Sequence, residues 1–188
     1  MKFSREWAMP SHDTFSIPPI RRFVERYLPE DPSAISVDPF ARNSRLCTLR
    51  NDLNPDTLAE YHLDAKDFLL GLHRDYLGKI SFAILDPPYS VRQVAECYKG
   101  VGRNVTSEDT RCDFWPKVKR ALYPLLTEDA VVLSFGWNSC GMGLKMGFEQ
   151  KEILLTAHGG NHNDTICLAE QKIVNNLARL FESTSSKS

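Results

Sequence analysis

The chain alternates short apolar runs with longer segments in which apolar residues recur every three or four positions. Short apolar runs are typical of buried strands, and the three-to-four spacing is typical of helices with one apolar face. The predicted strands cover residues 34–37, 46–49, 80–85, 130–135, 152–157 and 165–169, and the predicted helices cover residues 20–28, 65–77, 114–126 and 173–181. Strands that alternate with helices and close with a hairpin predict an α/β fold, with a mostly parallel sheet and an antiparallel C-terminal hairpin strand at its edge.

Length and composition predict one domain. A chain of 188 residues can bury a substantial core, and no repeat or second boundary interrupts the pattern. We therefore expect one domain over residues 1–182 and a disordered tail over residues 183–188. The longest apolar runs are shorter than the roughly 20 residues that span a bilayer, and the N-terminus lacks the apolar core of a signal peptide. The five cysteines have no CxxC spacing, which is typical of reduced thiols. Together, these features predict a cytoplasmic protein without membrane attachment.

The strand predicted over residues 80–85 runs directly into Asp86-Pro87-Pro88-Tyr89. Two consecutive prolines stop the strand, because neither nitrogen can donate to a sheet ladder. In a parallel sheet, ligands bind at this carboxyl end of the strands. A carboxylate, a proline carbonyl and an aromatic ring suit a planar group that carries an exocyclic amine, such as a nucleobase. The same four residues would also serve as a plain proline-rich cap of the strand.

Three further acids lie at the ends of predicted elements. Asp38 follows the strand over residues 34–37, Asp52 follows the one over residues 46–49, and Asp64 precedes the helix over residues 65–77. Carboxylates at successive strand ends suit a nucleoside cofactor, because ribose hydroxyls and the adenine amine are hydrogen-bond donors. Acids also cap helix N-termini, and for Asp64 alone capping is the simpler interpretation.

In this order, the motifs resemble those of S-adenosylmethionine-dependent DNA methyltransferases that modify an amino group, of the adenine-N6 type. Asp86-Pro87-Pro88-Tyr89 matches the catalytic DPPY motif of that family, and Asp38-Pro39-Phe40-Ala41 matches the start of its cofactor loop. Asp52-Leu53-Asn54 matches the position that binds the ribose, and Asp64 matches the one that reads the cofactor's adenine. Residues 14–20 resemble the segment that packs on the methionine moiety. The resemblance covers about residues 10–172, and it departs from the family at Arg42-Asn43, where glycines are expected.

This resemblance implies a Rossmann-like methyltransferase sheet and an enzyme that methylates the N6 amine of adenine in DNA, with S-adenosylmethionine as cofactor and no metal. It implies a catalytic set and a cofactor set. The catalytic residues would be Asp86, Pro87, Pro88 and Tyr89, and the cofactor would contact Phe15, Ser16, Asp38, Phe40, Ala41, Asn43, Asp52, Leu53, Asp64, Ala65 and Asp86. Asp86 and the Pro87 carbonyl would accept the amine's hydrogens, while Tyr89 stacks on a base flipped from the duplex.

The surface that contacts DNA is predicted from the charge pattern. The whole chain carries a net charge of −1, but residues 91–120 contain seven basic and four acidic residues, a local net charge of +3. Such an excess can meet a phosphate backbone, although a mixed solvated surface is the commoner explanation of an excess this small. The candidate phosphate contacts are Arg92, Lys99, Arg103, Arg111 and Lys117. With no separate target-recognition domain evident, recognition would need this segment, the loop after Phe135, a second copy of the chain or a recognition subunit.

Other functions remain open at this point. An N4-cytosine methyltransferase uses the same geometry, often with a serine in place of Asp86, and an RNA adenine methyltransferase could act on single strands. From another class, the chain could be a noncatalytic cofactor-binding subunit, against which the intact DPPY motif argues. His158, His162 and Asp164 have the residue types of a metal site, but two adjacent glycines favour a plain polar turn.

Overall fold

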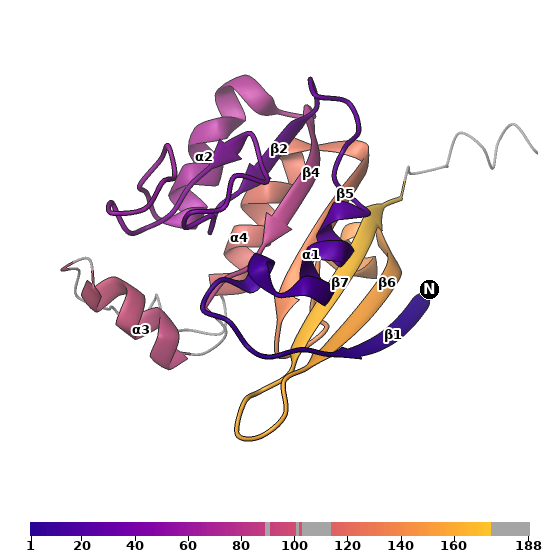
Figure 1. Cartoon of the computed structure of the whole chain (residues 1–188). Helices are drawn as coiled ribbons and strands as arrows, with labels where there is room; N and C mark the ends of the chain where they lie inside the picture. Colours follow the sequence, from indigo (N-terminus) through magenta and orange to yellow (C-terminus); the bar gives the residue numbers. More distant parts are fainter. Residues whose placement is uncertain (89–90, 101, 103–113, 174–188) are drawn as a thin grey trace, which may run out of the picture.

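The computed structural model describes residues 1–88, 91–100, 102 and 114–173, and its centre is a seven-stranded sheet (Figure 1). In chain order the strands are β1 (Lys2–Trp7), β2 (Ile35–Asp38), β3 (Leu49–Arg50), β4 (Ile80–Leu85), β5 (Leu126–Gly136), β6 (Phe148–Ala157) and β7 (Thr165–Lys172). Across the sheet their order is β1-β6-β7-β5-β4-β2-β3. Every neighbouring pair is parallel except β5 with β7 and β6 with β7.

Helices cover both faces of the sheet. On one face, α1 (Pro18–Glu25) buries Ile20, Phe23 and Val24 against β4 and β5, and its two leading prolines lie where their missing N–H groups cost nothing. On the other face lie α2 (Ala65–Tyr76) and α4 (Phe114–Leu122), which share a second apolar cluster with β4. A further helix, α3 (Val91–Gly100), stands beyond the carboxyl end of β4 (Figure 1). None of the helices in the described ranges is both long and apolar enough to cross a bilayer.

Short 3₁₀ turns join these elements: η1 (Thr14–Ser16), η2 (Tyr123–Leu125) and η3 (Leu144–Met146). The segment predicted as one helix over residues 114–126 is therefore α4, then η2, then the start of β5. Pro124 in η2 explains the break, because proline has no N–H to continue the helical hydrogen bonds.

The structure confirms the predicted α/β fold with a mostly parallel sheet and an antiparallel C-terminal hairpin strand. The predicted position of that strand is wrong: β7 inserts between β5 and β6 instead of lying at the edge. The edge next to β6 is occupied by β1, a strand that the hydrophobic pattern did not predict. The predicted tail over residues 183–188 lies outside the described residues, as does the predicted last helix beyond Ile173.

Candidate functional site

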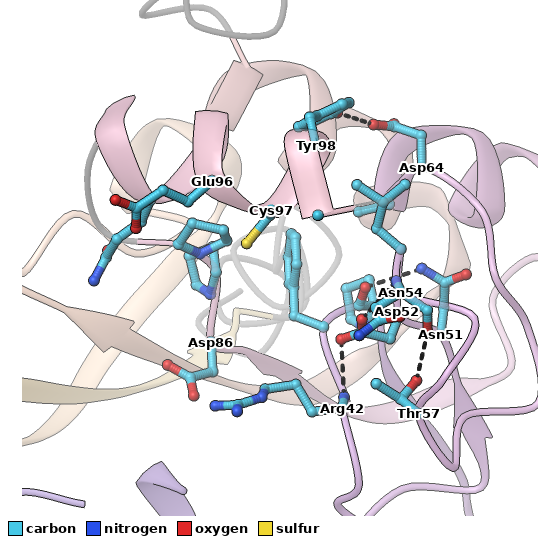
Figure 2. A pocket seen from close by; sticks show the side chains of 18 of the residues that line it. Arg42, Asn51, Asp52, Asn54, Thr57, Asp64, Asp86, Glu96, Cys97 and Tyr98 are labelled. Carbon is cyan, nitrogen blue, oxygen red and sulfur yellow. Dashed lines mark hydrogen bonds between the residues drawn. The ribbon is translucent and has the colours of Figure 1, made fainter. Parts of the chain in front are cut away.

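A cavity of about 670 Å³ lies at the carboxyl ends of β2, β3 and β4 (Figure 2). This size is typical of a small-molecule site. Its walls come from the loops that follow these strands, the start of α2, one side of α3 and the N-terminal segment around His12. Its polar lining includes His12, Arg42, Asp52, Asp64, Asp86 and Tyr98.

Asn51 connects the loops around this cavity. Its side chain is fully buried, and its amide nitrogen donates to the carbonyl oxygens of Pro39 and Leu63, at 3.1 and 3.0 Å. Its side-chain oxygen accepts the Leu63 N–H at 2.9 Å. One buried amide therefore joins the loop after β2 to the segment that leads into α2.

Asp52, the next residue, lines the cavity and organises the backbone on two sides. Its Oδ2 accepts the backbone N–H of Arg42 at 3.0 Å, and its Oδ1 accepts that of Asn54 at 2.9 Å. A carboxylate has about four acceptor sites, so these two bonds leave capacity for a ligand hydroxyl.

Asp64 is the N-cap of α2, which confirms the capping interpretation made from the sequence. Its Oδ1 accepts the Lys66 N–H at 3.0 Å, and its Oδ2 accepts the hydroxyl of Tyr98 at 2.6 Å. The bond to Tyr98 comes from α3, so α3 is tied to the start of α2 across the cavity wall (Figure 2). Capping does not exclude ligand contact, since Asp64 also lines the cavity.

Asp38, the last residue of β2, is not among the residues that line the cavity. It is fully buried; Oδ1 accepts the Phe40 N–H at 2.9 Å, and Oδ2 has no partner within the described part of the chain. Burial raises the pKa of Asp38 well above its usual range, the Phe40 bond opposes this, and the charges of Asp86 and Asp52 raise the pKa further. Three acids at one sheet edge therefore create a site that favours positive charge.

Replacing Asp38 with asparagine is expected to stabilise the free protein at neutral pH. A raised pKa means that the folded state retains a proton that the unfolded chain releases, so the contribution of Asp38 to stability is complete below its unfolded pKa and is lost as the pH rises through its folded pKa. Asparagine keeps an acceptor for the Phe40 N–H without a charge. Thermal unfolding from pH 4 to 8 should show a gap between Asp38→Asn and the parent that widens with pH. A gap independent of pH would contradict the assignment.

Asp86 follows β4, is half-buried, and lines the cavity together with Pro87 and Pro88. Figure 2 shows its carboxylate on the same side of the cavity as the end of the Arg42 side chain. Its charge is one of the causes that raise the pKa of Asp38. Tyr89, predicted to stack on the target base, lies outside the described residues.

The other residues predicted for the cofactor divide into two groups. Phe40, Leu53 and Ala65 line the cavity with Asp52, Asp64 and Asp86. Phe15, Ser16, Ala41 and Asn43 are not among the lining residues. The Phe15 ring packs on Phe135, with centroids 5.3 Å apart. Ser16 bonds within its own turn, Ala41 is buried, and Asn43 accepts the Leu58 N–H.

The predicted phosphate contacts are only partly described. Lys99 is exposed on α3, and Lys117 is half-buried on α4. The side chain of Arg92 and all of Arg103 and Arg111 lie outside the described residues.

Several cavity residues were missed by the sequence analysis. Glu96, Cys97 and Tyr98 all come from α3, which stands out in the sequence only as part of a basic segment. Arg42 was noted only as a departure from glycine. Burial raises the pKa of Cys97, the charge of Asp52 adds to this, and the charge of Arg42 opposes it. The charges of Asp52 and Arg42 therefore act on a thiol of α3 that lines the cavity.

His158, at the start of the β6–β7 turn, has a structural role. The His158 Nδ1 lies 2.9 Å from the Ala8 carbonyl oxygen, its Nε2 lies 2.9 Å from the Thr165 hydroxyl, and its backbone N–H donates to Asp164. Both ring nitrogens are thus engaged within the protein. No group of three or more His, Cys, Asp or Glu side chains suited to a metal occurs in the described ranges.

Comparison with known proteins shows the fold. No protein-family model matches the sequence, and no curated protein matches it. Among solved structures, the chain is similar to TrmN from Thermus thermophilus, with a TM-score of 0.51, 14% identity and coverage of 84% of this chain and 49% of TrmN. It is also similar to SMU.776, a candidate methyltransferase complexed with SAH, with a TM-score of 0.53, 10% identity and coverage of 80% and 48%. The chain therefore spans about half the length of each of these proteins and shares their fold.

Proposed function

We propose that the chain is an S-adenosylmethionine-dependent methyltransferase that modifies the exocyclic N6 amine of adenine in DNA. The observation that carries the proposal is one cavity lined by Asp52, Asp64 and Asp86, which come from the loop after β3, the N-cap of α2 and the loop after β4. The fold shared with SMU.776, which was solved with SAH, supports the same cofactor class.

The charges around the cavity favour this cofactor over a nucleotide with phosphates. Among the described lining residues there are five carboxylates and one guanidinium, that of Arg42. Such a lining repels a phosphate chain and attracts a cation. When bound, S-adenosylmethionine supplies a methyl group on a positively charged sulfonium. Asp52 would accept the ribose hydroxyls and Asp64 the adenine amine, so the chemistry of these residues fits the cofactor.

Asp86 and the Pro87 carbonyl are the proposed acceptors for the target amine. This amine is a poor nucleophile, because its lone pair is delocalised into the ring. Two acceptors would bind its two hydrogens and direct the lone pair toward the methyl group. The contribution of these residues is then orientation, together with negative potential where positive charge develops. Tyr89 would stack on the flipped base.

DNA would reach the cavity from the carboxyl edge of the sheet. Phosphate contacts are proposed for Arg92, Lys99, Arg103, Arg111 and Lys117, all within residues 91–120, the segment with a basic excess. With a net charge of −1 for the whole chain, the protein has little bulk attraction for DNA. We therefore propose that target recognition also involves a second copy of the chain or a recognition subunit.

The proposal is tested with a methyl-transfer assay on duplex DNA, single-stranded DNA and RNA, using labelled S-adenosylmethionine. Digestion to nucleosides then identifies the product. N6-methyladenine from DNA is expected. Label in N4-methylcytosine or only in RNA would overturn the assigned substrate. Calorimetric titration with S-adenosylhomocysteine accompanies the assay, and absence of both binding and transfer would overturn the function.

Asp52→Ala is expected to weaken cofactor binding by about 1–3 kcal/mol, because a charged acceptor for the ribose hydroxyls is lost. Calorimetry should show this in the dissociation constant before it appears in turnover at saturating cofactor. Asp56→Ala is the matched control, since it removes the same charge from the same cavity wall. Equal losses in the two variants would mean that net charge, not a specific bond from Asp52, sets the affinity.

A further inference from the structure

Arg42 has a backbone conformation that usually requires glycine. It is the one non-glycine residue with a positive φ, 49°, among the described residues. A side chain is unfavourable in this left-handed region, because Cβ approaches the carbonyl oxygen. The resemblance described above leads one to expect glycine here. A strained arginine at such a position points to a role for its side chain.

Hydrogen bonds of the Arg42 backbone and of its guanidinium hold the residue in place. The backbone N–H of Arg42 donates to Asp52, and the preceding Ala41 N–H donates to the Asn51 carbonyl at 2.8 Å. At the other end, the guanidinium donates through Nη1 to the carbonyl oxygen of His12. The side chain is thereby fixed to the N-terminal segment just before residues 14–20, which resemble the segment that packs on the methionine moiety.

The guanidinium lies between two acids with different proposed tasks. Figure 2 shows the Arg42 side chain extending along the cavity from the side of Asp52 toward Asp86. Asp52 is proposed for the ribose and Asp86 for the methyl transfer. No lysine or second arginine is present among the described residues that line the cavity. A ligand that spans these two acids and carries one anionic group would place that group within reach of Arg42.

We propose that Arg42 is a specificity-determining residue that binds the carboxylate of the cofactor's amino-acid end. This inference rests on the proposed function. A guanidinium offers five donors in a planar fork, so it can bind a carboxylate while it retains the bond to His12. The surrounding acids favour the sulfonium and the amine of the cofactor. Arg42 supplies the positive charge that the cofactor's carboxylate needs in this acidic cavity. The strained backbone is then the cost of placing a cation where glycine would leave none.

The test uses calorimetric titration with two ligands that differ only in the anionic group. These are S-adenosylhomocysteine and its decarboxylated form, which keeps the amine. Arg42→Gly should raise the dissociation constant of S-adenosylhomocysteine by about tenfold to a hundredfold. The dissociation constant of the decarboxylated form should rise by less than about twofold. Arg42→Lys should be intermediate, since it keeps the charge but not the fork. Glycine suits a positive φ, so thermal unfolding should show that Arg42→Gly remains folded.

Other outcomes would overturn the inference. Equal weakening of both ligands by Arg42→Gly would mean that the Arg42 side chain acts only by fixing the N-terminal segment through its bond to His12, and not by binding the carboxylate. Unchanged binding of both ligands, with weaker DNA binding, would assign the guanidinium to a phosphate instead. If the parent protein binds neither ligand, the proposed function itself fails. Binding of both ligands with equal affinity by the parent would contradict only the role of Arg42.

Discussion

Replacing Asp86 with alanine is expected to lower methyl transfer by at least about a hundredfold, with little change in cofactor affinity. Asp86 follows β4 in the cavity, next to the Pro87 carbonyl. Without its carboxylate, one hydrogen of the target amine loses its acceptor and the lone pair is no longer directed toward the methyl group. The cofactor would lose the contact predicted for Asp86 but keep those proposed for Asp52 and Asp64, so its dissociation constant should change far less than turnover.

Calorimetry with S-adenosylhomocysteine and single-turnover assays at saturating cofactor separate these two effects. Asp75→Ala, at an exposed position in the last turn of α2, is the matched control for loss of one carboxylate. The variant should remain folded, because removing the Asp86 charge removes one of the causes that raise the pKa of the buried Asp38. Near-normal turnover of Asp86→Ala would exclude Asp86 as the acceptor of the amine.

The parts of the fold that could be predicted are those with strong local signals. The predicted strands over residues 34–37 and 80–85 correspond to β2 (Ile35–Asp38) and β4 (Ile80–Leu85), since each is a short apolar run that an acid and a proline follow. The predicted helix over residues 65–77 corresponds to α2 (Ala65–Tyr76), where apolar spacing and the Asp64 cap agree. Three of the acids that line the cavity, Asp52, Asp64 and Asp86, were found for the same reason, because each marks the boundary of an element.

The parts that were missed depend on contacts between distant residues. All but one residue of β1 is exposed, so it has no apolar run, and it is a strand only because it pairs with β6. β7 was predicted as a strand, but its place between β5 and β6 is set by pairing that no local pattern encodes. The positive φ of Arg42 depends on its bond to Asp52, ten residues away.

The loop between β5 and β6 depends on another such distant contact. Glu170 of β7 is fully buried, and its carboxylate accepts the backbone N–H groups of Met142 at 2.5 Å and Gly143 at 3.0 Å. Lys119 of α4 donates to the carbonyl oxygen of Cys140 at 2.9 Å and to that of Gly141. Two charged side chains from different elements thus fix this loop, which begins at the same sheet edge as Asp86, since β4 and β5 are parallel.

Gly141→Ala is expected to lower the free energy of unfolding by about 2–4 kcal/mol, because the loop has no room for a methyl group. A Cβ at Gly141 would lie 1.8 Å from Oε2 of Glu170 and 2.6 Å from Cδ2 of Leu168. Neither neighbour can move freely, since Leu168 is buried and Glu170 would lose its bonds to the loop backbone. Denaturant unfolding measures the effect.

Gly71→Ala is the control for Gly141→Ala, and the two substitutions should have opposite effects. Gly71 lies within α2, and its Cβ would meet nothing within 4 Å. Alanine should therefore stabilise the helix by roughly 0.5–1 kcal/mol, through its lower backbone entropy in the unfolded state. The same chemical change then tests two environments in one protein. If Gly141→Ala were as stable as Gly71→Ala, the loop would not be packed against Glu170 in solution, and the part of the sheet edge beside Asp86 would be free to rearrange around a substrate.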